Sequence, residues 1–200
     1  MDAEISGQLV VPDEAHGMVV FVHGSGSSSR SPRNRYVAGA LNEAGLGTFL
    51  FDLLTPEEEL DRANVFDIEL LAGRLLAATG RVRAEPAAAR LPLGYFGAST
   101  GAAAALWAAA EPDAGVAAVV SRGGRPDLAG ARLGSVRAPT LLIVGGHDEQ
   151  VLELNREAQR ELGGESRLEV VPGATHLFEE PGALERVADL AGLWFGAHFG

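Results

Sequence analysis

Residues 91–110 read LPLGYFGASTGAAAALWAAA, and they predict a buried strand, a tight turn and a helix in immediate succession. The turn, Gly97-Ala98-Ser99-Thr100-Gly101, has the Gly-x-Ser-x-Gly pattern of a nucleophile elbow. A serine hydroxyl is a weak nucleophile, and a sharp strand-to-helix turn exposes it and aims a helix N-terminus at developing negative charge. The two glycines let the neighbouring elements approach closely. This setting, more than the short pattern itself, indicates a nucleophile at Ser99.

Suitable partners for the serine follow it along the chain. Residues 139–148 (PTLLIVGGHD) form a second buried-strand pattern that ends at Asp148, and residues 167–176 (RLEVVPGATH) form a third that ends at His176. Ser99, Asp148 and His176 have the chain order of a hydrolase triad placed at the carboxyl edge of a parallel sheet, where open α/β sheets bind ligands. His176 is the predicted general base, because that group titrates near neutrality. Asp127, after the preceding strand, stays open as the alternative acid.

A third feature lies in residues 17–26, GMVVFVHGSG, where an apolar run ends in a His-Gly loop. Acyl transfer builds negative charge on the carbonyl oxygen, and two backbone N–H donors near the nucleophile stabilise that charge. We predict that Thr100 and Ser25 supply these donors, with Gly26 as the alternative to Ser25. His23 is expected to shape the loop through hydrogen bonds.

These segments resemble the α/β-hydrolase superfamily from about Gly17 to Trp194, and within it the small, lidless dienelactone-hydrolase-like branch. The resemblance is carried by HGSGSSSRSPRNRYVA, FDLLTPEEE, GYFGASTGAA, SRGGRPDLAG, LLIVGGHDE and VVPGATHLFEEPGAL. Dienelactone hydrolases proper use a cysteine nucleophile, and this chain contains no cysteine. Serine-ester chemistry is therefore implied, and the lactone substrate is not. The loop after Asp52 also lacks the glycine-rich turn of many other branches.

Strand and helix patterns alternate along the whole chain. Strands are expected near residues 5–11, 17–22, 46–52, 92–98, 115–121, 139–145 and 166–171, and helices over 33–44, 64–79, 99–110, 149–162 and 182–198. Such alternation predicts an α/β fold with a mostly parallel central sheet and helices on both faces, as a single domain spanning residues 1–200. Fewer than twenty residues separate the strands near Ser121 and Thr140, so no cap domain is expected and the site should be open.

The composition of the chain limits the classes of partner that it is expected to bind. The chain has 200 residues, a formal net charge of −11 and no cysteine. The negative charge argues against nucleic acid and anionic membranes, since both require a basic face. The first twenty residues do not read as a signal peptide, and no apolar run approaches ~18 residues, so a cytoplasmic location is expected. We expect a small-molecule ester substrate and no metal or organic cofactor. Trp194, Phe195 and Phe199 read either as core residues or as a homodimer contact.

All sixteen basic residues are arginines, and five of them follow strands that end at the predicted site: Arg30, Arg33, Arg35, Arg122 and Arg125. One interpretation, which we favour, is pairing with acids on comparable loops, among them Asp52 and Asp127. The other is a clamp for a substrate carboxylate or phosphate, with Arg33 and Arg125 as its members, because a guanidinium binds either group bidentately.

The sequence therefore predicts a serine hydrolase that cleaves small carboxylic esters through an acyl-enzyme intermediate. A thioesterase or a small-peptide hydrolase would share the same triad. A catalytically silent hydrolase fold that serves as a binding module is the alternative from another class. The segment GSGSSSR at residues 24–30 lacks the Gly-Lys-Ser/Thr ending of a nucleotide-binding loop, which argues against nucleotide binding.

Overall fold

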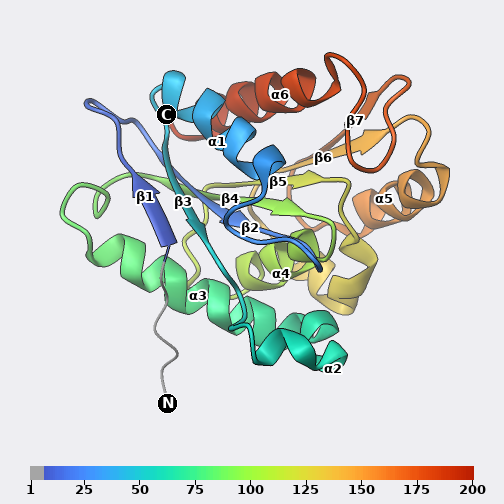
Figure 1. The fold of residues 1–200 in the computed structure, drawn as a ribbon, viewed down its shortest axis with the longest axis horizontal. Coiled ribbons are helices and arrows are strands. Elements are labelled where there is room, and N and C mark those ends of the chain that lie inside the picture. The colour runs from blue at the N-terminus through green and yellow to red at the C-terminus, as the bar shows by residue number, and fades with distance from the viewer. Residues whose placement is uncertain (1–6) are drawn as a thin grey trace.

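The computed structural model describes residues 7–200, and a seven-stranded sheet with the order β1-β3-β2-β4-β5-β6-β7 runs through its centre (Figure 1). Only β1 runs antiparallel to its neighbour, and the other pairs are parallel. The strands are β1 Gly7–Val10, β2 Met18–Val22, β3 Gly47–Phe51, β4 Leu93–Ala98, β5 Ala118–Arg122, β6 Thr140–Gly145 and β7 Ser166–Val171. The predicted mostly parallel sheet is confirmed.

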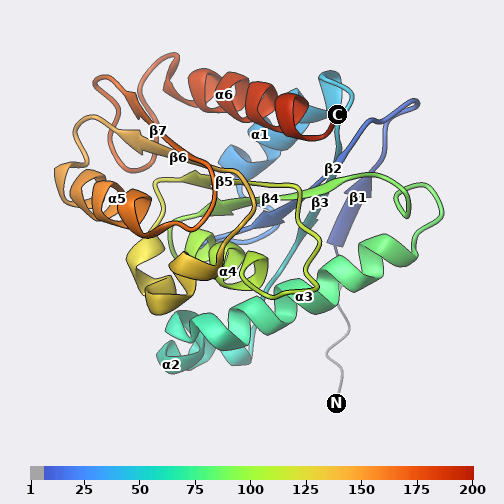
Figure 2. The same cartoon turned by 180° about the vertical axis from the view of Figure 1, so that it is seen from behind.

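Helices cover both faces of this sheet, as the two opposite views show (Figures 1 and 2). On one face lie α1 (Pro32–Glu43) and α6 (Ala183–His198), and on the other lie α3 (Ile68–Ala84) and α4 (Thr100–Ala109). The remaining α-helices are α2 (Arg62–Phe66) and α5 (Glu149–Glu161). Side chains of β2 alternate between the two layers: Val20 packs in the core cluster with α3 and α4, and Phe21 in the cluster with α1 and α6.

The nucleophile helix α4 is buried along almost its whole length. Its run Ala102–Ala105 is fully buried, and small side chains let the sheet and α3 pack closely around it. At Gly101 any Cβ would overlap the carbonyl oxygens of Val22 and His23. The prediction that this glycine permits a close approach is confirmed.

Three features of the middle of the chain differ from expectation. The helix predicted over residues 64–79 is divided, because the Asp67 carboxylate accepts a hydrogen bond from the Leu70 N–H and caps a new helix. That helix also continues past Gly80 to Ala84. An exposed glycine costs a helix only about 1 kcal/mol, and burial of Val82 in the core offsets it. The 3-10 helices Glu58–Leu60 and Pro126–Ser135 were not expected.

The connection between β5 and β6 contains only the 3-10 helix, so the described part of the chain has no cap domain. Trp194 and Phe195 of α6, and Phe199 at its C-terminal end, are buried in the core, as the first of the two interpretations expects. Residues 5 and 6 of the expected first strand lie outside the described residues. From residue 7 onward, the structure has no helix of the length and apolar character needed to cross a membrane.

Candidate active site

Ser99 lies at the turn between β4 and α4 in a conformation that non-glycine residues rarely adopt. Its φ is 50° and its ψ is −122°, a strained region that costs about 1–3 kcal/mol. The end of β5 and the segment after it hold this turn: the Ser99 N–H donates to the Arg122 carbonyl (3.2 Å), and the Ser99 carbonyl accepts from the Arg125 N–H (3.0 Å). These two hydrogen bonds hold the strained turn at the sheet's carboxyl edge, in the geometry typical of a nucleophile elbow.

The structure brings the other predicted triad members to the same edge. His176 follows β7, and its Nδ1 donates to Asp148 Oδ2 over 2.6 Å; Asp148 itself follows β6. Ser99 and His176 line one cavity of about 320 Å³. Asp127 instead accepts two hydrogen bonds from Arg125, so the geometry favours Asp148 over Asp127 as the partner of the imidazole.

The loop that carries His176 is held by its own hydrogen bonds. The Thr175 hydroxyl donates to Glu180 Oε1 (2.6 Å), and this bond, together with backbone N–H donors, lowers the pKa of the Glu180 carboxyl. Gly123, with a φ of 51°, lies against the imidazole, where a Cβ would stand 3.4 Å from the ring. Both contacts restrict where His176 can point.

The predicted oxyanion donors have different surroundings. Thr100 occupies the first position of α4, where a helix leaves its N–H groups without intrahelical partners. The Ser25 N–H, by contrast, donates to the Thr100 hydroxyl oxygen over 2.9 Å. For Gly26 no backbone acceptor is found among residues 7–200. In this conformation Gly26 is therefore freer than Ser25 to serve as the second donor.

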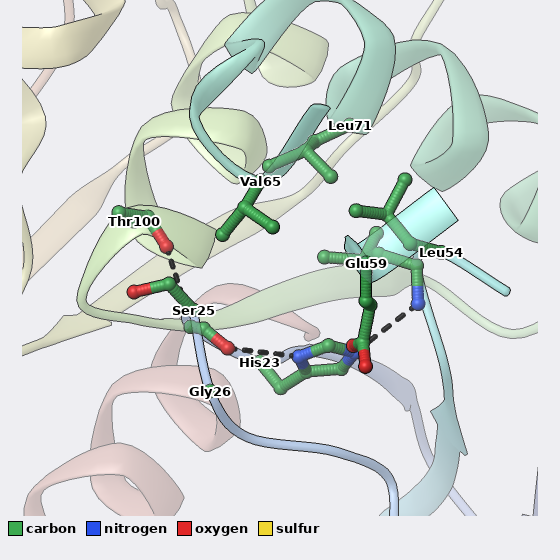
Figure 3. A pocket seen from close by; sticks show the side chains of 10 residues that line it. His23, Ser25, Gly26, Leu54, Glu59, Val65, Leu71 and Thr100 are labelled. Carbon is green, nitrogen blue, oxygen red and sulfur yellow. Dashed lines mark hydrogen bonds between the residues drawn. The ribbon is translucent and has the colours of Figure 1, made fainter. Parts of the chain in front are cut away.

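His23 joins the loop after β2, which carries the predicted oxyanion donor, to the segment after β3 (Figure 3). Its ring is buried, and its Nε2 accepts from the Leu53 N–H at 3.1 Å. The ring proton is therefore on Nδ1, which donates to the Gly24 carbonyl at 3.0 Å. The expected loop-shaping hydrogen bonds of His23 are present.

A second, smaller cavity of about 110 Å³ is lined in part by the loop that follows β2 (Figure 3). It shares Gly24, Ser25 and Gly26 with the Ser99 cavity. The rest of its wall is mostly apolar, and Glu59 is the carboxylate in the lining. The other lining residues are His23, Leu53, Leu54, Val65, Leu71 and Thr100.

Three of the five arginines singled out in the sequence have different surroundings in the structure. Arg125 binds Asp127 through both Nε (2.8 Å) and Nη2 (2.7 Å) and is not part of the cavity lining, so the ion-pair interpretation holds for it. Arg33 lines the cavity and pairs with Glu179 at 3.1 Å. Arg122 lines it too and is only 8% exposed. Burial and the nearby Arg33 lower the pKa of Arg122 to about 10.

Sequence reasoning grouped Arg122 with the other arginines but did not single it out. Its position as the last residue of a fully buried strand was the available signal. Within residues 7–200, no group of three or more His, Asp or Glu side chains is arranged to hold a metal ion.

A dienelactone hydrolase of Anabaena variabilis has a crystal structure that matches this fold with a TM-score of 0.94. The two proteins are 56% identical, and the match covers 98% of this chain and 93% of that one. The chain belongs to the dienelactone hydrolase family. Within the wider fold, this dienelactone hydrolase family member also matches Est1E of Butyrivibrio proteoclasticus, with 16% identity, a TM-score of 0.82 and coverage of 98% and 96% of the two chains. These neighbours support a hydrolase.

Mycobacterium tuberculosis has a longer relative of this dienelactone hydrolase family member, provisionally named a phosphoribosyl transferase. It is 66% identical over 194 residues, which cover 97% of this chain. The chain spans only 44% of the length of that relative. No family model matches the chain.

Proposed function

We propose that this protein is a serine hydrolase that cleaves small carboxylic esters, with Ser99 as nucleophile, His176 as general base and Asp148 as the acid that orients it. The observation that carries the proposal is the strained Ser99 turn opening into the same cavity as an imidazole already bonded to a carboxylate. A strained serine turn and a carboxylate-bonded imidazole around one cavity are not needed to stabilise a fold, so a catalytic role is the better explanation.

The mechanism follows from these positions. His176 Nε2 takes the Ser99 proton while Oγ attacks the ester carbonyl, and the Asp148 carboxylate stabilises the imidazolium. The Thr100 N–H, with Gly26 or Ser25, stabilises the oxyanion. The imidazolium then protonates the departing alkoxide, and water repeats the sequence to release the acid. Among the bonds of residues 7–200, none joins the Ser99 hydroxyl to His176, so the proposed mechanism requires the hydroxyl to turn toward the ring when substrate binds.

The transferase name of the longer mycobacterial relative is not carried over to this chain. More than half of that protein lies outside the match, and the matched part corresponds to the site described above. A thioesterase remains the second candidate, because a thioester carbonyl would meet the same nucleophile and the same oxyanion donors.

A fluorophosphonate probe tests the proposal directly, because it labels only an activated serine. We expect wild-type protein to be labelled and Ser99→Ala to lose both labelling and ester hydrolysis while keeping its fold. Ser135→Ala, at an exposed site in the β5–β6 connection, is the matched control and should behave as wild type. Unlabelled wild type would favour a silent binding module, and a labelled Ser99→Ala variant would move the nucleophile elsewhere.

A further inference from the structure

Resting on the hydrolase function above, we infer that Asn155 is a positioning residue for the reaction. Its side-chain amide holds residues 122–125, an Arg-Gly-Gly-Arg sequence that we call the diglycine segment. This segment contacts both Ser99 and His176. The amide therefore sets the position of the nucleophile relative to the general base, although it does not itself touch the substrate.

Asn155 is a polar residue in the middle of an apolar helix face. It lies on α5 and is 0% exposed, and its neighbours at helical spacing, Val151 and Ala158, are buried apolar side chains. Its Oδ1 is buried and has no hydrogen-bond partner among residues 7–200. A buried amide with an unsatisfied oxygen destabilises a fold, and an apolar side chain would avoid that cost. The packing of α5 alone therefore does not explain an asparagine at this position.

The Asn155 amide nitrogen donates two hydrogen bonds. One goes to the Val151 carbonyl in its own helix (2.8 Å), and the other goes to the Gly124 carbonyl in the diglycine segment (3.0 Å). In the part of the chain that the structure describes, the Gly124 carbonyl has no other hydrogen-bond donor. Because Gly124 is buried, its carbonyl depends on this one donor.

Gly124 is packed too closely to move independently of its surroundings. A Cβ at this position would overlap the Ser121 Oγ of β5 and the Ala102 Cβ of α4. The backbone of the diglycine segment therefore lies directly on the end of β5 and on the helix that follows the nucleophile. A shift of Gly124 would be transmitted to both.

The diglycine segment contacts both the proposed nucleophile and the proposed base. The Arg125 N–H donates to the Ser99 carbonyl (3.0 Å), and the Ser99 N–H donates to the Arg122 carbonyl (3.2 Å). Gly123 lies against the imidazole of His176, where a Cβ would stand 3.4 Å from Nδ1. Without the amide donor, the Ser99 turn and the imidazole would be free to move relative to each other.

The helix α5 connects the same amide to the proposed acid. Asp148 is the residue before α5 begins, and its carbonyl accepts from the Leu152 N–H (2.8 Å). Asn155 follows about two helical turns later, so the two residues lie on the same face of the helix. One helix therefore holds Asp148 at its first turn and, through Asn155, the segment that is bonded to Ser99.

Small shifts between reacting groups have large effects on rate. A misplacement of about 1 Å can lower a rate roughly a hundredfold, even when the substituted residue lies away from the chemistry. Substrate affinity depends on the walls of the site, and Asn155 lines neither of its two cavities. We therefore expect loss of the amide to lower kcat and to leave KM nearly unchanged.

Two substitutions remove the amide with opposite effects on packing. Asn155→Leu keeps the site filled, whereas Asn155→Ala leaves it partly empty. Fluorophosphonate labelling of Ser99 gives a rate and a final extent, and hydrolysis of ethyl butyrate gives kcat and KM. We expect both variants to reach full labelling, but about ten- to a hundredfold more slowly than wild type. Their kcat should fall by the same factor at an unchanged KM.

Leu152→Ala is the matched control on the same helix. Leu152 is buried in a separate apolar cluster with Val144 and Val151, so its truncation destabilises α5 without removing the bond to Gly124. We expect this variant to have a lower Tm, measured by circular dichroism, and a wild-type labelling rate for each labelled site. A positioning role thus predicts that rate and Tm change independently.

The remaining outcomes overturn the inference in different ways. Wild-type labelling rates in both Asn155 variants would overturn it and leave the hydrolase function standing. Rates that fall in proportion to Tm in all three variants, Leu152→Ala included, would make Asn155 a structural residue only. A raised KM at an unchanged kcat would show that Asn155 acts on substrate binding. Absence of labelling and turnover in wild type would instead remove the hydrolase function, and this inference with it.

Discussion

Asp148 and Asp127 both follow strands at the catalytic edge, but they hold different partners. Asp148 accepts the Nδ1 proton of His176, whereas Asp127 is bound by Arg125. An asparagine at position 148 cannot stabilise the imidazolium and favours the wrong tautomer, so we expect Asp148→Asn to lower kcat by up to ~10⁴-fold. Asp127→Asn should cost less than about tenfold. Steady-state kinetics on ethyl butyrate measure both, and the reverse ranking would assign the acid to Asp127.

The hydrogen bond between Thr100 and Ser25 allows the second oxyanion donor to be identified. Thr100→Val keeps the shape of the side chain but removes the acceptor of the Ser25 N–H. If Gly26 is the donor, the loop loses a tether worth about 1 kcal/mol, and kcat falls roughly fivefold, while Thr100→Ser keeps wild-type activity. If Ser25 is the donor, Thr100→Val frees its N–H and kcat rises. We expect the fall, measured with ethyl butyrate at saturation.

At the residue scale, sequence reasoning placed Ser99, Asp148 and His176 because each is a reactive residue just after a buried apolar run. The structure brings these three residues to one edge. The sequence could not show that the Ser25 N–H meets a hydroxyl 75 positions away. Nor could it show which arginine pairs with an acid. Arg125 binds Asp127, two residues further along the chain, whereas Arg122 is buried. Local patterns identify reactive residues, but tertiary packing assigns their partners.

At the element scale, the strands were predicted well because continuous apolar runs are typical of a buried parallel sheet. Helix ends were predicted less well. The predicted helix over residues 64–79 includes Asp67 as an ordinary helical position, although its carboxylate caps the Leu70 N–H and starts α3. A helix end at Gly80 assumes that one exposed glycine destabilises the helix more than the burial of Val82 stabilises it, and the reverse holds.

That misplaced helix end yields a stability test. A Cβ at Gly80 would meet nothing within 4 Å, and the residue lies exposed inside α3. Gly80→Ala should therefore raise the free energy of unfolding by about 0.8–1 kcal/mol, or Tm by about 2–4 °C. Gly101→Ala is the matched contrast. Its Cβ would overlap two carbonyl oxygens of the β2 segment, so Tm should fall. Thermal unfolding followed by circular dichroism measures both, and no gain from Gly80→Ala would mean that α3 is under other constraints.

At the scale of the whole molecule, an acidic protein holds positive charge inside its site. Acidic residues outnumber basic ones by 27 to 16, yet Arg122 is buried where no carboxylate balances it among the described residues. Residues that serve a ligand often reduce the stability of the free protein. The stability of the whole fold should therefore report the cost of burying this one charged side chain.

Arg122→Met keeps the aliphatic volume and removes the charge, so we expect Tm at pH 8 to rise by a few degrees. Folding lowers the pKa of Arg122 to about 10, so above about pH 10 the unfolded chain keeps a proton that the folded chain releases. Wild-type stability must then increase as pH rises through about 10. The advantage of the variant should accordingly shrink between pH 8 and pH 11, and differential scanning calorimetry of both proteins checks it. A variant that is less stable at pH 8, by an amount that does not change with pH, would show that the folded protein already compensates the charge.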